Sequence, residues 1–115
     1  MIGIGQTQEI LKQYAKHGWT LRRVLLSARA REILPVSIFG NARVSAADFD
    51  ALWFARSSAD GGEAWELRNL SAMPFALVEL FSGDDDEAVR EESRTAMETQ
   101  MKERASKPVA RKREV

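Results

Sequence analysis

Residues 48–69 read D-F-D-A-L-W-F-A-R-S-S-A-D-G-G-E-A-W-E-L-R-N and predict a β-hairpin. Two runs rich in aromatic and aliphatic residues flank Asp60, Gly61 and Gly62, which are residues typical of a tight turn between paired strands. A hairpin with two apolar runs needs cover on at least one face. We therefore expect a sheet with helices packed against it.

The register of this hairpin is predicted from its apolar pattern. With Asp60 and Gly61 at the centre of the turn, the cross-strand pairs gather large apolar side chains on one face. Trp53 then lies on the opposite face, across from Arg68, either covered by a helix or exposed for recognition; we expect coverage. The apolar face consists of Leu52, Phe54, Trp65 and Leu67.

The segments that follow the hairpin predict one more strand and a helix. Residues 75–81 have apolar side chains on both faces and one charge, Glu79, so we expect a central strand or one covered on both sides. Carboxylates stabilise a helix N-terminus, so the acidic run at 84–87 favours a helix that reaches about residue 104. A thin stripe of alanine, valine and methionine indicates a surface helix.

The segments that precede the hairpin predict a helix, a strand and a second helix. The first helix is expected to begin at an N-cap, Thr7, and to end before Gly18, with Trp19 turned back onto Tyr14. Residues 19–26 have both helical and strand spacing, and we favour a strand. The reason is Ser27, a good N-cap for a short helix that ends at the following proline. Residues 36–47 are expected to be a connector.

These elements predict an α+β fold in the order α-β-α-β-β-β-α. We expect a small, mainly antiparallel sheet of three or four strands with the terminal helices packed on it. Residues 1–105 are predicted to form a single domain, because a chain of 115 residues supports one core. Residues 106–115 contain little apolar surface and are predicted to be a disordered basic tail.

The composition indicates in which cellular compartment and to which broad class of protein this chain belongs. The chain has no cysteine, no signal-peptide pattern and no apolar run long enough to cross a membrane, so we expect a soluble cytoplasmic protein without membrane contact. The formal net charge is zero, yet residues 1–45 carry seven basic and two acidic residues while residues 46–83 carry two and six. Such segregation is balanced within the fold, between copies, or by a bound polyanion.

No catalytic or metal-binding pattern emerges. The single histidine, His17, lies at a predicted helix end, where a cation complements the helix dipole. The acidic run at 84–87 does not match a calcium loop, because consecutive helical residues point to different sides. We therefore expect no catalytic residue, no metal, no cofactor and no small-molecule substrate.

The strongest candidate for a binding surface is a group of arginines near the first strand. We expect these arginines to pair with acidic residues, namely Asp48, Asp50, Glu63 or Glu66, and the alternative is that they contact the phosphates of a nucleic acid together with the basic tail. Trp53 and Arg68 complete the predicted binding surface. The arginines are Arg22, Arg23, Arg29 and Arg31.

The order of elements, with Gly18 and Trp19 ahead of the first strand, resembles the small double-stranded-RNA-binding-like folds, which include mRNA-cleaving toxins. Those toxins depend on a strand histidine that this chain does not have, so no family is assigned and no activity is carried over. We expect a non-enzymatic binding or regulatory module that associates with itself or with another protein. The alternative is a nucleic-acid-binding protein.

Overall fold

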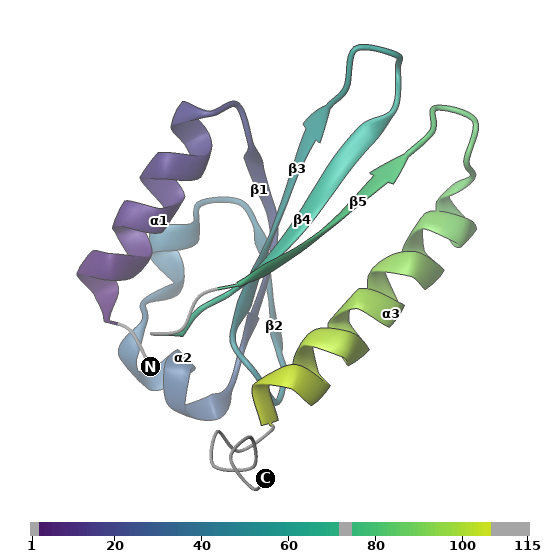
Figure 1. The fold of residues 1–115 in the computed structure, drawn as a ribbon. Helices are drawn as coiled ribbons and strands as arrows, with labels where there is room; N and C mark the ends of the chain where they lie inside the picture. The colour runs from purple at the N-terminus through teal and green to yellow at the C-terminus, as the bar shows by residue number, and fades with distance from the viewer. Residues whose placement is uncertain (1–2, 72–74, 107–115) are drawn as a thin grey trace, which may run out of the picture.

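The computed structural model describes residues 3–71 and 75–106. Within these residues a five-stranded sheet lies between helices on its two faces (Figure 1). The elements are α1 (Ile4–Lys16), β1 (Thr20–Leu26), α2 (Ala28–Ile33), η1 (Val36–Phe39, a 3-10 helix), β2 (Arg43–Ala46), β3 (Ala51–Ser57), β4 (Glu63–Asn69), β5 (Ala76–Phe81) and α3 (Glu87–Ser106).

The sheet has the strand order β2-β1-β3-β4-β5, and it is mixed. β1 pairs with β2 in parallel, whereas the other neighbours are antiparallel. The α+β class is confirmed, but the expectation of three or four antiparallel strands is wrong because residues 36–47 are more than a connector. They contain η1 and β2, which has one large apolar residue, Val44, and reaches β1 through a helical crossover that leaves no turn signal.

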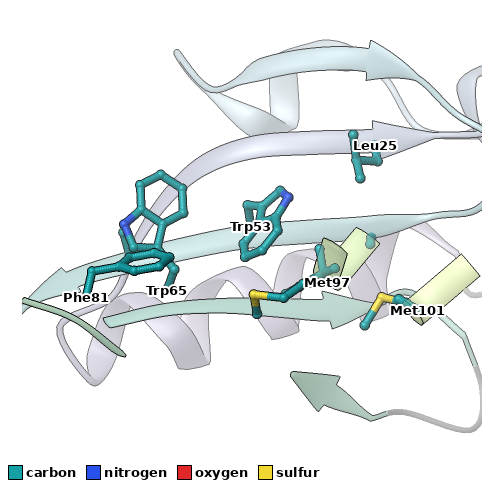
Figure 2. Close-up of a cluster of buried hydrophobic side chains, with 9 residues drawn as sticks. Leu25, Trp53, Trp65, Phe81, Met97 and Met101 are labelled. Atoms are coloured by element: carbon teal, nitrogen blue, oxygen red, sulfur yellow. The ribbon is translucent and has the colours of Figure 1, made fainter. Parts of the chain in front are cut away.

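Helices cover both faces of this sheet (Figure 1). On the face of α1 and α2, the buried core consists of Val24, Leu26, Ala30, Leu34, Phe39, Leu52, Phe54 and Leu70. On the face of α3, it consists of Leu25, Ala51, Trp53, Ala55, Trp65, Leu67, Phe81, Met97 and Met101 (Figure 2). The strand assignment of residues 20–26 and the packing of both terminal helices on the sheet agree with expectation.

The hairpin of β3 and β4 is present, but the predicted register is wrong by one residue. Ala55 pairs with Trp65 and Trp53 pairs with Leu67, so Trp65 and Leu67 lie on the α3 face and not beside Phe54. The turn is a five-residue loop, 58–62, in which the Asp60 carboxylate accepts hydrogen bonds from the Ser58 hydroxyl and the Gly62 amide. The predicted register assumed a two-residue turn, Asp60 and Gly61. A loop with an odd number of residues shifts every cross-strand pair by one residue relative to that register.

Gly62 is required where this loop approaches the end of β5. A Cβ atom at this position would lie 2.1 Å from the carbonyl oxygen of Phe81, which is closer than any side chain allows. The glycine therefore lets the hairpin and β5 come together, as expected of a residue without a side chain at a close backbone approach.

The helix ends show which local predictions are correct. Gly18, with φ of 87°, ends α1, and the amide of Trp19 donates to the carbonyl of Tyr14, which is the predicted Schellman ending. The N-cap is Gly3 and not Thr7, whose hydroxyl donates to the Gly3 carbonyl from inside the helix. Ser27 caps α2 as predicted, by accepting the amide of Ala30.

The C-terminal helix begins within the acidic run at 84–87, as predicted. α3 starts at Glu87, after Asp86 has accepted a hydrogen bond from the amide of Val89 in the manner of an N-cap. It ends at Ser106, and the rest of the predicted tail lies outside the described residues.

Candidate functional site

The four arginines of the predicted cluster fall into two separate groups. Arg22 and Arg23 lie in the first half of β1, whereas Arg29 and Arg31 lie in α2, beyond the other end of that strand. Arg29 and Arg31 are exposed. The structure therefore does not bring the four arginines together as one surface.

Arg22 and Arg23 both approach Trp65 because β1 contains a β-bulge. The pairing of β1 with β3 shifts between Leu21 and Arg23, which leaves Arg22 without a partner residue on β3. Consecutive side chains of a regular strand point to opposite faces, and a bulge changes the direction of one of them. The guanidinium carbons of Arg22 and Arg23 lie 5.3 Å and 5.5 Å from the centroid of the Trp65 ring.

A third arginine reaches the same ring from α3. The guanidinium carbon of Arg94 lies 4.3 Å from the centroid of Trp65, within the range of a cation–π contact. Its side chain is only 1% exposed and forms ion pairs with Glu87 and, at 3.0 Å, with Glu91. Arg94 is thus a buried cation that joins α3 to the sheet.

The partner of Arg23 is Glu91 on α3, so the expected pairing with a carboxylate of the hairpin is wrong for this arginine within the chain. The two terminal nitrogens of Arg23, Nη2 and Nη1, donate to the carboxylate of Glu91, at 2.8 Å and 3.2 Å. These hydrogen bonds lower the pKa of Glu91 below its usual value, and Arg94 adds to the effect. Asp48, one of the predicted partners, instead forms an ion pair with Lys102 at 2.8 Å.

Arg90 and Arg94 belong to this cluster but were not expected in it. The sequence predicts a surface helix here, yet Arg90, Arg94, Met97 and Met101 follow one another at helical spacing on the side that faces the sheet. Arg90 donates to Glu63 at 2.9 Å. Extending the methionine stripe toward the N-terminus would have identified both arginines.

Trp53 and Arg68 do not form the predicted recognition pair, because they lie on opposite faces. Trp53 is fully buried beneath α3 and donates from Nε1 to Glu98 at 2.7 Å, so the expected coverage by a helix is confirmed. Arg68 pairs with Leu52 across the strands and therefore lies on the α1 face, where it donates to the carbonyl of Asn69.

β5 is a second candidate surface, and it is an edge strand rather than the central strand that the sequence predicts. Phe75, Leu77 and Phe81 pack toward α3. On the opposite face Val78 is 54% exposed and Leu80 is 71% exposed, although both are large and apolar. The error arises because apolar residues on both faces of a strand predict cover on both faces, and α1 does not extend over β5 (Figure 1).

A polar contact is buried under α1. Tyr14 stacks on Phe54, with ring centroids 3.9 Å apart, and its hydroxyl donates to Glu66. Burial, together with this carboxylate, raises the pKa of Tyr14 above its usual value, which keeps the phenol protonated. The pair satisfies two polar groups at the helix–sheet interface and joins α1 to β4.

The other described side chains that could take part in catalysis or bind a metal ion are not gathered in one place. The Nδ1 atom of His17 lies 2.9 Å from the carbonyl of Gln13 at the exposed end of α1. Among residues 3–71 and 75–106, no three histidine or carboxylate side chains are placed to hold a metal ion. In the same part of the chain, none of the helices has the length and apolar character needed to cross a membrane.

No protein-family model, curated protein or solved structure matches this chain. The function is therefore argued from its own surfaces.

Proposed function

We propose that this protein is a non-enzymatic association module that pairs with a second copy of itself through β5. The observation that carries the proposal is the apolar, unprotected edge of the sheet. Proteins usually protect an edge strand with lysine, proline, a bulge or a very short length. β5 has six residues, a regular register with β4, and no lysine, proline or bulge; its one charged residue, Glu79, is exposed and lies on the α3 face.

The backbone of β5 presents free hydrogen-bonding groups at alternate residues. The amide of Asn69 donates to the carbonyl of Phe75, which fixes the direction of the odd-numbered residues toward β4. The even-numbered residues Ala76, Val78 and Leu80 then direct their amides and carbonyls to the open edge. These same residues carry the exposed apolar side chains. One partner strand would therefore pair with the free backbone groups and also cover the apolar side chains.

A second copy fits this edge in a register that uses all of its free backbone groups. In an antiparallel pair with Val78 on the two-fold axis, Val78 faces its counterpart and Ala76 faces Leu80. Every outward-directed residue of β5 then exchanges backbone hydrogen bonds, and the apolar side chains form one continuous strip. Glu79 faces Leu77 of the second copy.

The neighbouring register is less favourable. With Glu79 on the axis, two like charges would lie directly opposite each other, which destabilises a sheet pair. Ala76 would also pair beyond the end of the partner's β5. The difference between the two registers supports a specific pairing rather than general adhesion of an apolar edge.

The oligomeric state tests this proposal. We expect the wild-type protein to show a concentration-dependent dimer in sedimentation velocity and in size-exclusion chromatography with light scattering. Val78→Lys should shift the protein to monomer, because two lysines would face each other on the axis. Val89→Lys is the matched control: Val89 has nearly the same exposure, 53%, but lies on α3.

A second variant excludes misfolding as the cause. Val78→Pro removes an amide that points away from β4, so it should abolish dimerisation while the thermal midpoint of the monomer changes little. A wild-type protein that remains monomeric from micromolar to millimolar concentration contradicts the proposal. A dimer that tolerates both substitutions contradicts it equally.

The nucleic-acid alternative has less support. Binding along a nucleic acid needs a continuous basic track, but the first-strand arginines and the α2 arginines are separated by the second half of β1, residues 24–26, whose side chains are apolar. Arg23 is already paired with Glu91.

A further inference from the structure

The hollow beside the β1 bulge has an excess of positive charge. It has a volume of about 400 Å³ and is lined by Trp65, two glutamates and five arginines, which are Arg22, Arg23, Arg43, Arg90 and Arg94. Glu63 binds Arg90, and Glu87 binds Arg94. The carboxylates around the hollow are therefore already occupied by some of the arginines.

Two of the arginines remain uncompensated. Among the described residues, no carboxylate lies within ion-pair distance of Arg22 or Arg43. Arg43 is also the direct partner of Arg23 across the parallel pair of β1 and β2, so the two cations extend from the same face. Like charges directly opposite each other destabilise a sheet. Glu91 already pairs with Arg23, so Arg43 is the cation of this pair that has no counterion among the described residues.

A further donor at the hollow lacks an acceptor. The Nε atom of Arg90 is buried without a hydrogen-bond partner, although its Nη1 and Nη2 atoms donate to Glu63 and to the carbonyl of Ser82. A buried donor without an acceptor is costly. The hollow thus presents forked, permanently charged donors, and one of the arginines that line it also has a buried donor without an acceptor.

We infer that this hollow binds a phosphate dianion, free or carried by a small molecule, with Arg22 and Arg43 as its main ligands. Arginine matches a phosphate because its fork donates two parallel hydrogen bonds. A nucleotide base is a poor fit, since Trp65 is only 5% exposed and already contacts three guanidinium groups. A nucleic-acid strand is disfavoured because the basic surface does not continue toward Arg29.

Titration calorimetry with inorganic phosphate tests this inference, at an ionic strength held constant with chloride. We expect one phosphate per chain. Arg22→Gln and Arg43→Gln should each weaken binding about tenfold or more, which is the loss expected for a charge-assisted hydrogen bond. Arg29→Gln is the matched control, since it removes an exposed arginine from α2, and it should bind phosphate as the wild type does.

The site variants should remain folded, because neither Arg22 nor Arg43 takes part in an ion pair within the described chain. Without phosphate the thermal midpoint of Arg43→Gln should equal or exceed that of the wild type, and that of Arg22→Gln should fall only slightly through loss of its exposed contact with Trp65. With phosphate only the wild type and Arg29→Gln should gain stability. Absence of phosphate binding, or equal weakening in all three variants, would overturn the inference.

A second experiment replaces inorganic phosphate with a mixed-sequence single-stranded oligonucleotide. We expect no retention in fluorescence anisotropy. Binding that is tighter than that of phosphate, with a salt dependence indicating several contacted phosphates, would overturn the small-anion assignment in favour of nucleic acid. Phosphate binding can be tested separately from dimerisation through β5, because Val78→Lys leaves every arginine of the hollow in place.

Discussion

On the face covered by α1 and α2, the buried side chains are almost all hydrocarbon, whereas the face covered by α3 combines hydrocarbon with stacked arginines and ion pairs. The first face is held mainly by apolar burial, which depends little on salt. The second includes charged contacts, and salt screens these where they are exposed. One sheet therefore carries two layers whose stability responds to different conditions.

The largest expected effect is on the hydrocarbon face. Phe54→Ala should lower the free energy of unfolding by about 3–5 kcal/mol, because Phe54 is 1% exposed and also loses its stacking on Tyr14. Urea denaturation at low and high salt measures this loss. The loss should be the same at both salt concentrations, and a near-neutral substitution would contradict the packing of this face.

An intermediate effect is expected on the α3 face. Arg94→Ala should cost about 2 kcal/mol or more, because it removes a desolvated cation–π contact together with the ion pairs to Glu87 and Glu91. Arg104→Ala is the control: Arg104 lies 4.1 Å from the centroid of Phe75 but is exposed, so its loss should cost about 0.5 kcal/mol. Equal losses in urea denaturation would show that burial of Arg94 adds nothing.

The smallest effect concerns pH. Because the pKa of Glu91 is lowered in the folded protein, its contribution is fully present above the unfolded pKa and disappears as the pH falls through the folded pKa. Glu91 is 48% exposed, so solvent screening limits the contribution to about 0.5 kcal/mol. Thermal unfolding of Arg23→Gln against the wild type between neutral and acidic pH should show the two curves converging in acid. Parallel curves would contradict this linkage.

Local signals predicted much of the fold. Gly18 ends α1, and Ser27 begins α2, because each depends on hydrogen bonds among neighbouring residues. The alternation of β3 placed Phe54 and Trp53 on opposite faces correctly. The register was wrong because the loop from 58 to 62 is closed by the Asp60 side chain, whose contacts do not depend on the apolar pattern.

Long-range features escaped prediction. β2 pairs with β1 only after a crossover, and the β-bulge at Arg22 appears only when β1 meets β3. Neither has a signature in neighbouring residues. The arginine cluster could not be predicted for the same reason, since Trp65 and Arg94 are brought together only by packing of α3 on the sheet. The open edge of β5 was missed because the sequence does not indicate how far α1 extends across the sheet.

The parallel pair of β1 and β2 has a consequence for local unfolding. β2 is a four-residue strand at the rim of the sheet, all of its residues are partly or fully exposed, and it is held through one neighbour. Such a segment belongs to the least stable cooperative unit of a domain and opens without global unfolding. Because β2 carries Arg43, the anion hollow exists only while this strand is docked. Phosphate binding as inferred above and docking of this strand are therefore linked equilibria, in which phosphate favours the docked strand and undocking weakens phosphate binding.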